Sequence, residues 1–159
     1  MKKHEKTNVM RILDQKKIDY VSHSYDGTGA VSGVEVAEVL GQNPDVVFKT
    51  LVTEGKSREH YVFVIPVSAE LDLKKAAHAV GEKSIAMIKS KELLPLTGYV
   101  HGGCSPIGMK KFFKTVIDES SLSCDRIVFS AGKIGYQVEM SLDELSKVIA
   151  FSTADIREF

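Results

Sequence analysis

The chain has 159 residues, of which 43% are apolar and 26% are charged, and its formal net charge is zero. This composition is typical of one globular domain, and it excludes a protein that holds nucleic acid by overall positive charge. No apolar run approaches the roughly 20 residues that span a bilayer. The two cysteines do not make a disulfide framework, and the five histidines are scattered. We therefore expect a cytoplasmic protein with no metal site and no other cofactor.

The N-terminal part of the chain predicts two short helices on either side of a strand. Residues 8–17 carry apolar side chains at helical spacing, and Thr7 is suited to cap their first turn. Residues 20–25 alternate as a strand does. Ser32 and Glu35 then stand three apart, which is the spacing of a capping box, so a second helix should start there.

The next part of the chain predicts a long antiparallel hairpin followed by a helix. Residues 47–53 and 60–67 are the two strands, and a polar segment with a glycine joins them. Because the second strand is apolar on both faces, we expect it to lie centrally in its sheet. Asp72 is suited to cap a helix that Gly81 ends.

The remaining elements are mostly short strands. A helix should follow the Ser141 capping box, and a last helix is expected near residues 154–158. The order of strands and helices does not follow a strict β-α-β alternation, so we predict one α+β domain. Its mixed sheet should be curled or barrel-like, with short helices packed around it. The expected strands are residues 84–88, 114–118, 126–130, 136–140 and 148–151.

A glycine-rich stretch, residues 98–111, stands out from the rest of the chain. It contains the pair Gly102-Gly103 followed by Cys104-Ser105-Pro106, which leaves several backbone amides unlikely to join a regular ladder. Such amides can bind an anion or stabilise a developing oxyanion. The alternative, which the residue types alone favour, is a bent strand followed by a tight turn.

Lys49 is the most unusual charge in the sequence. On its predicted strand it shares a face with Val47 and Leu51, so its ammonium group is in a confined place if that face is partly buried. There it could bind a carbonyl oxygen or a phosphate. The alternative is a lysine that extends to water or protects a sheet edge.

Cys104 invites the hypothesis of a cysteine nucleophile, because His101 lies three residues upstream. On an extended segment that spacing places the two side chains on opposite faces, so a small buried thiol is the better interpretation. Ser105 and Ser130 lie close to glycine turns but not in a GxSxG motif. We interpret both serines as hydrogen-bonding residues of turns or of a ligand pocket.

The lysines gather in local clusters along the chain. Each cluster could contact a phosphate backbone, although a solvated face is the ordinary interpretation of such a pattern. The clusters comprise Lys74 and Lys75, then Lys89 and Lys91, then Lys110, Lys111 and Lys114.

Several segments, taken together and in order, resemble one family closely. The family is the YbaK/EbsC group of aminoacyl-tRNA deacylases, which hydrolyse Cys-tRNA(Pro) and are similar to the editing domain inserted in bacterial prolyl-tRNA synthetases. The resemblance covers nearly the whole chain, residues 1–159, as a single deacylase domain. The segments that carry it are Val47-Phe48-Lys49-Thr50-Leu51, Leu71-Asp72-Leu73-Lys74-Lys75-Ala76-Ala77, Thr97-Gly98-Tyr99-Val100-His101-Gly102-Gly103-Cys104-Ser105-Pro106-Ile107-Gly108 and Ser130-Ala131-Gly132-Lys133.

The resemblance implies a compact α+β fold with a mixed, barrel-like sheet, and it implies roles for particular residues. The family's key lysine corresponds to Lys49, and the glycine pair near the substrate ester corresponds to Gly102 and Gly103. The positions that line the family's substrate pocket correspond to Tyr25, Thr50 and Ser130.

The resemblance also implies a mechanism without a protein nucleophile. The thiol of the mischarged cysteine attacks its own ester carbonyl, while Lys49 and the backbone of Gly102 and Gly103 orient and stabilise the reacting ester. Two residues depart from the expected pattern, because Ser32 stands where an aromatic residue is expected and Gln137 where an acid is expected. Both departures leave the aminoacyl specificity open, with alanine and homocysteine as alternatives to cysteine.

The sequence therefore predicts a trans-editing hydrolase that deacylates misacylated tRNA(Pro), with Cys-tRNA(Pro) as the expected substrate. Because the net charge is zero, we expect weak affinity for tRNA. The resemblance implies a complex with prolyl-tRNA synthetase, which would supply the missing tRNA selectivity. Two other functions stay open. One is a non-catalytic module that binds the tRNA acceptor end or a synthetase, and the other is a cysteine-dependent hydrolase of small esters or amides.

Overall fold

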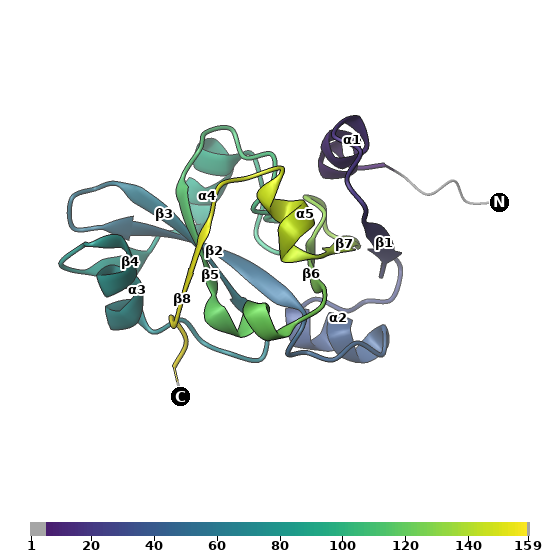
Figure 1. Ribbon diagram of the computed structural model, residues 1–159, viewed down its shortest axis with the longest axis horizontal. Coiled ribbons are helices and arrows are strands. Elements are labelled where there is room, and N and C mark those ends of the chain that lie inside the picture. The colour runs from purple at the N-terminus through teal and green to yellow at the C-terminus, as the bar shows by residue number, and fades with distance from the viewer. Residues whose placement is uncertain (1–5, 159) are drawn as a thin grey trace.

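The computed structural model describes residues 6–158, which form two β-sheets with short helices around them (Figure 1). None of the helices in this range has the length and apolar character needed to cross a membrane. The elements are α1 (Asn8–Gln15), β1 (Val21–Ser24), α2 (Gly33–Val39), β2 (Phe48–Gly55), β3 (His60–Pro66), α3 (Leu73–Val80), β4 (Ile85–Met87), α4 (Ser90–Thr97), β5 (Lys114–Asp118), the 3-10 helix η1 (Glu119–Ser123), β6 (Ile127–Ser130), β7 (Tyr136–Met140), α5 (Leu142–Ser146) and β8 (Ser152–Ala154).

The larger sheet has the strand order β4-β2-β3-β5-β8. The predicted hairpin of β2 and β3 is confirmed, with Lys49 opposite Ile65 and Val52 opposite Val62. β3 lies at the centre of the sheet, and it pairs in parallel with β5. Its alternate residues enter two different core clusters, because Val62 and Val64 pack on one side and Tyr61, Phe63 and Ile65 on the other. This double burial explains why β3 is apolar at nearly every position.

The smaller sheet has the strand order β1-β7-β6, and both of its pairings are antiparallel. It meets the larger sheet at one short parallel bridge between Val47 and Val128, where the Val128 amide donates to the carbonyl of Val46 at 2.9 Å. The α+β class and the mixed pairing are thus confirmed. The strands form two sheets that meet at this junction and do not close into a barrel.

The prediction for the C-terminal residues is wrong in its details. We expected a strand at residues 148–151 and a helix near 154–158, but β8 lies at Ser152–Ala154 and the following residues are not helical. Buried Asp118 explains the difference, because its carboxylate accepts a hydrogen bond from the Ile156 amide at 3.1 Å. The carbonyl of Ile156 in turn accepts from the Asp72 amide at 2.8 Å. These partners, distant in sequence, hold the segment extended.

Candidate functional site

A cavity of about 660 Å³ lies where the two sheets approach each other, and its walls come from both. A volume of this size is typical of a small-molecule site. From the larger sheet the lining takes residues of β2 and β4, and from the smaller sheet it takes Tyr25, which follows β1, and the ends of β6 and β7. Residues of α2, α4 and the glycine-rich stretch complete it. Of the residues that the sequence predicts for the site, those that line this cavity are Tyr25, Lys49, Thr50, Gly102 and Ser130.

Lys49 projects into the cavity from β2. Its side chain is 32% exposed, and its Nζ lies 3.9 Å from an oxygen of Glu70, which also lines the cavity. That separation is longer than a hydrogen bond, and the Glu70 side chain is 80% exposed, so water weakens the attraction. The ammonium group therefore keeps donors available for an oxygen atom of a ligand.

Thr50 follows Lys49 on β2 and also lines the cavity. Its Oγ1 is buried and, among the described residues, has no hydrogen-bond partner. Nearly all buried hydroxyl groups in folded proteins are hydrogen-bonded, so an exception calls for an explanation. Because this oxygen has less than 1 Å² of accessible surface, a ligand in the cavity can become its partner only after the Thr50 side chain rotates.

Tyr25 and Ser130 line the cavity from the smaller sheet, where Tyr25 directly follows β1 and Ser130 ends β6. The Tyr25 amide donates to the carbonyl of Gly135 at 2.8 Å, which fixes the end of β1 beside the turn before β7. Ser130 Oγ accepts from the Gly132 amide at 3.1 Å and so shapes the turn between β6 and β7. Both residues are held in place by the backbone of that turn.

The two glycines of the pair differ in their surroundings. Gly102 lines the cavity with a φ of 89°, a left-handed conformation that favours glycine, and its amide has no acceptor within residues 6–158. The Gly103 amide instead donates to the carbonyl of Val100 at 3.0 Å, and Gly103 is not among the lining residues. A Cβ at Gly103 would stand 3.1 Å from the Ile134 amide nitrogen. Gly103 thus lets the loop pack closely against the turn before β7.

Cys104 lines the cavity, but it lacks the surroundings of a nucleophile. Its side chain is buried, and burial raises the pKa of the thiol to about 12, so it stays protonated at neutral pH. Within the described part of the chain, no hydrogen bond joins it to His101. These observations agree with the interpretation of Cys104 as a packing residue.

The two residues that depart from the family pattern both line the cavity. The Ser32 side chain caps α2, accepting from the Glu35 amide at 3.2 Å, and Glu35 completes the predicted capping box. Buried Gln137 accepts a hydrogen bond from Gln42 Nε2 at 2.9 Å. Neither Gln42, which contacts Gln137, nor Glu70, which lines the cavity, was predicted, because each follows a turn whose path the local pattern does not reveal.

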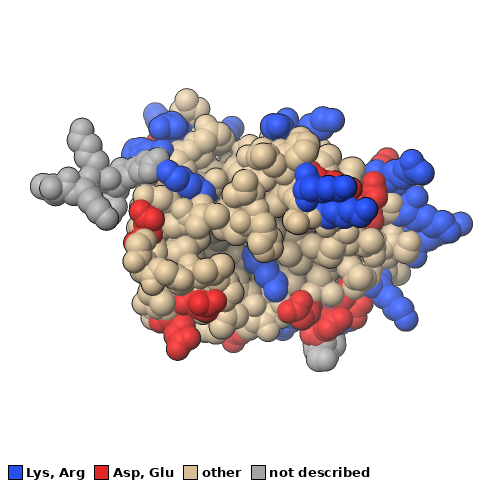
Figure 2. Space-filling view, turned by 180° about the vertical axis from the view of Figure 1, so that it is seen from behind, with Lys and Arg blue, Asp and Glu red and all other residues tan. Residues whose placement is uncertain are grey.

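Charge on the surface is unevenly distributed although the net charge is zero. Figure 2 shows a hollowed face with Lys and Arg along one edge and at one end, and Asp and Glu along the opposite edge. The turn after β2 and the turn after α3 lie together, since the Lys56 amide donates to the Ser84 carbonyl at 3.1 Å, and they bring exposed Lys56, Arg58 and Lys83 to one end. Within residues 6–158, no group of three or more His, Cys, Asp or Glu side chains could hold a metal ion.

Comparisons with known proteins point to one family. The family model described as "Aminoacyl-tRNA editing domain" matches residues 29–148. The "Putative Cys-tRNA(Pro)/Cys-tRNA(Cys) deacylase EbsC" of Enterococcus faecalis is 42% identical over 156 residues, which are 98% of this chain and 95% of that protein. The "Proline--tRNA ligase" of Shouchella clausii is 31% identical over 102 residues, which are 64% of this chain and 18% of the ligase.

A solved structure shows the same fold. The crystal structure of "a putative trans-editing enzyme for prolyl tRNA synthetase" superposes with a TM-score of 0.81 at 22% identity, covering 96% of this chain and 99% of that one.

Proposed function

The chain belongs to the aminoacyl-tRNA editing domain family, and on this premise we propose that it is a trans-editing hydrolase that deacylates misacylated tRNA(Pro), with Cys-tRNA(Pro) as its substrate. The single observation that carries the proposal is the cavity itself. Lys49, Thr50 and Gly102 line it together, yet its only thiol among the described residues, Cys104, is held protonated. Such a site can orient and stabilise an ester without attacking it.

The proposed reaction uses the thiol of the substrate. The sulfur of the cysteinyl group attacks its own carbonyl carbon, a C–S bond forms, and the bond from that carbon to the 3′-oxygen of the tRNA breaks. The thiol proton ends on the leaving oxygen, which gives free tRNA and a small cyclic thioester. In this proposal Lys49 and the Gly102 amide stabilise the carbonyl oxygen or the leaving oxygen as negative charge develops, which is supported by the presence of both residues in the cavity lining.

The other predicted residues receive supporting roles in this proposal. Tyr25, Thr50 and Ser130 bind the aminoacyl-adenosine group from both sheets, and Gly103 holds the loop of Gly102 against its neighbouring turn. We propose that residues 1–159 act together as one cytoplasmic deacylase domain. Since the net charge is zero, we also propose that a complex with prolyl-tRNA synthetase supplies the selectivity for tRNA(Pro).

A deacylation assay of Lys49 variants tests the proposal. Replacement Lys49→Met should lower kcat/KM for Cys-tRNA(Pro) by about 100-fold to 1,000-fold, as the loss of one stabilising donor does in other enzymes. Lys49→Arg, which keeps the charge, should retain more activity. Urea unfolding of each variant controls for folding. Normal activity of folded Lys49→Met would refute the role of this lysine.

A substrate panel tests the specificity. Cys-, Ala- and Pro-tRNA(Pro) should be compared with and without prolyl-tRNA synthetase, and Cys-tRNA(Pro) should be hydrolysed fastest. Saturable binding of all three without release of any amino acid would instead identify a non-catalytic module.

A further inference from the structure

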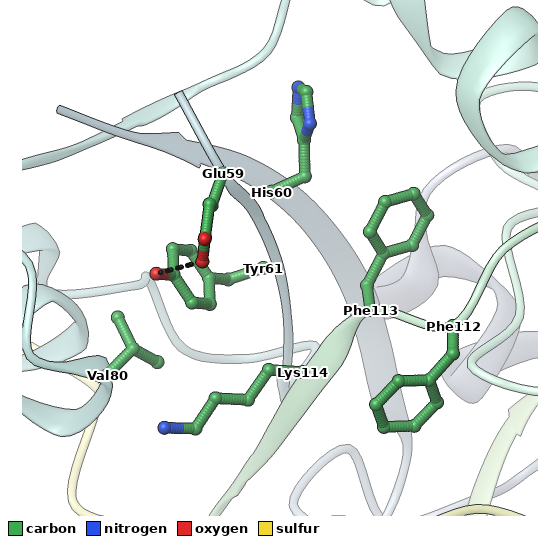
Figure 3. Close-up of a pocket in the computed structure, with 7 residues that line it drawn as sticks. All are labelled: Glu59, His60, Tyr61, Val80, Phe112, Phe113 and Lys114. Atoms are coloured by element: carbon green, nitrogen blue, oxygen red, sulfur yellow. Dashed lines mark hydrogen bonds between the residues drawn. The ribbon is translucent and has the colours of Figure 1, made fainter. Parts of the chain in front are cut away.

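A second, smaller pocket of about 410 Å³ lies away from the aminoacyl cavity, between the start of β3 and the residues before β5. Figure 3 shows Phe112 and Phe113 on one side of it, Glu59, Tyr61 and Val80 on the other, and Lys114 extending between them. The two sites share no lining residue. Along the chain, the glycine-rich stretch leads from Gly102, which lines the cavity, to Phe112, which follows the stretch and lines this pocket.

The aromatic side of this pocket presents a ring to solvent. Phe113 is half-buried and packs edge-on against His60, with ring centroids 6.0 Å apart. Phe112, by contrast, is 73% exposed. Its exposed ring offers a face on which a planar group such as a nucleotide base can stack.

The charges near Phe112 favour a polyanion. Lys114 lines the pocket, and Lys110 and Lys111 directly precede Phe112 in the chain. All three are exposed, and no carboxylate lies within ion-pair distance of their ammonium groups in the part of the chain that the structure describes. Glu59 is the carboxylate that lines the pocket, and it accepts a hydrogen bond from the Tyr61 hydroxyl at 3.3 Å, on the wall opposite Phe112. Glu82 accepts from the same hydroxyl at 2.6 Å.

We propose that Phe112 and these three lysines form an RNA-binding platform, on which a nucleotide base stacks while the lysines contact the phosphates beside it. Sites for single-stranded RNA combine an exposed aromatic ring with lysines in this way. A protein-docking surface is the weaker explanation, because lysine is depleted in the cores of protein interfaces. The identification of the RNA as aminoacyl-tRNA rests on the proposed function, but the binding of RNA does not.

A tryptophan probe tests the stacking directly, because the chain contains no tryptophan. In Phe112→Trp, the fluorescence should be quenched as a ten-nucleotide RNA ending in CCA is added, since the indole ring would stack on a base. The matched control is Leu122→Trp, which places the probe on η1 at a position that is also exposed. Its fluorescence should not change. If the RNA quenches the fluorescence of neither variant, the proposal is overturned.

Binding and activity measurements complete the test. Phe112→Ala should weaken binding of the labelled RNA about fivefold to tenfold, and Lys111→Ala should reduce the dependence of binding on salt. Leu122→Ala and Lys16→Ala are the matched controls, and they should change neither the affinity for RNA nor its dependence on salt. Phe112→Ala should also raise KM for aminoacyl-tRNA while leaving cleavage of an aminoacyl-adenosine ester unchanged.

The outcomes separate this proposal from the proposed function. If the protein binds RNA through Phe112 but hydrolyses no aminoacyl-tRNA, the platform stands and the deacylase proposal fails. If deacylation is normal and the affinity of Phe112→Ala for RNA is unchanged, the platform is refuted. Loss of synthetase binding without loss of RNA binding would identify the surface as a protein-docking site instead.

Discussion

Cys104 and Thr50 illustrate how the surroundings of a residue determine its chemistry. Both line the same cavity, and in the sequence the thiol is the more reactive group. Burial holds the thiol in its protonated form, whereas the hydroxyl is buried without a partner. The more reactive group is therefore held inactive by its surroundings, and the hydroxyl becomes a partner for a ligand only when its side chain turns towards the cavity.

Cys104→Ala separates packing from catalysis. We expect deacylation at neutral pH to remain near the wild-type rate. Burial raises the pKa of the Cys104 thiol to about 12, from about 9 in the unfolded chain. The folded state therefore binds this proton more tightly, and the resulting contribution to the free energy of unfolding is complete below pH 9 and is lost as the pH rises towards 12. Urea unfolding between pH 8 and 10.5 should therefore show a smaller decrease of the free energy of unfolding in the variant. Loss of activity in the folded variant would revive the cysteine-nucleophile hypothesis.

Thr50→Val tests the unpaired hydroxyl. The free energy of unfolding should stay the same or rise by up to about 1 kcal/mol, because the native state loses no hydrogen bond. The value of kcat/KM should fall about threefold to tenfold if the substrate supplies the partner. Thr53→Val is the matched control on β2, since Thr53 Oγ1 donates to the Tyr61 carbonyl at 3.0 Å. It should lose about 1 kcal/mol of stability and keep normal kinetics.

Single residues of the site were predictable to different degrees. Lys49 stands out because a charge between apolar neighbours on a strand is unusual, and the structure places it at the cavity. The hydrogen bond from the Gly103 amide to the Val100 carbonyl depends on the path of the loop, which residue types do not specify. Gln42 contacts Gln137 from 95 positions away, so no local pattern could reveal the pair.

At the scale of elements, caps link helix stability to the site. The N-terminal residues of α2, Ser32 to Val34, line the cavity, so fraying of this helix end would disturb the wall. Gly33 also packs tightly there, because a Cβ at this position would stand 2.4 Å from a methyl carbon of Val67. The capping box therefore serves the shape of the cavity as well as the helix.

Ser32→Ala should lower the free energy of unfolding by about 1 kcal/mol, the usual cost of losing an N-cap, and should raise KM a few-fold. Ser141→Ala is the matched control. Ser141 caps α5 by accepting from the Glu144 amide at 3.2 Å, and α5 contributes no residue to the cavity. Its loss should cost similar stability with no change in KM. Equal KM in the two variants would show that α2 has no influence on the site.

Local signals predicted the elements better than they predicted the pairing between them. Capping residues and alternation identified α2, α3 and the β2–β3 hairpin, because those signals lie within a few residues of each other. The pairing of β1 with β7 joins Val21 to Glu139, and nothing in either strand alone specifies that partner. The prediction of a C-terminal helix was wrong for the same reason, because the hydrogen bond from the Ile156 amide to the buried Asp118 carboxylate joins residues far apart in the chain.

At the scale of the whole molecule, the cavity lies between the two sheets and is lined by residues of both. The described contacts between the sheets include the short Val47–Val128 bridge. The two sheets also share a buried core, in which Val52 and Val62 of the larger sheet pack in one cluster with Phe129 and Val138 of the smaller one. A ligand that contacts both walls would add to these connections. We therefore expect ligand binding to stabilise both sheets together.

Thermal unfolding with a non-hydrolysable analogue tests this coupling. An amide-linked 3′-aminoacyl-adenosine at 100 times its Kd should add about 2.7 kcal/mol to the free energy of unfolding, because it binds only the native state. For a chain of this size, that gain corresponds to a Tm increase of about 5–11 °C. Lys49→Met should show a smaller shift at the same concentration, since its affinity is lower. Hydrogen exchange should slow in β2 and also in β6 and β7, and protection confined to the larger sheet would mean that the ligand contacts one wall alone.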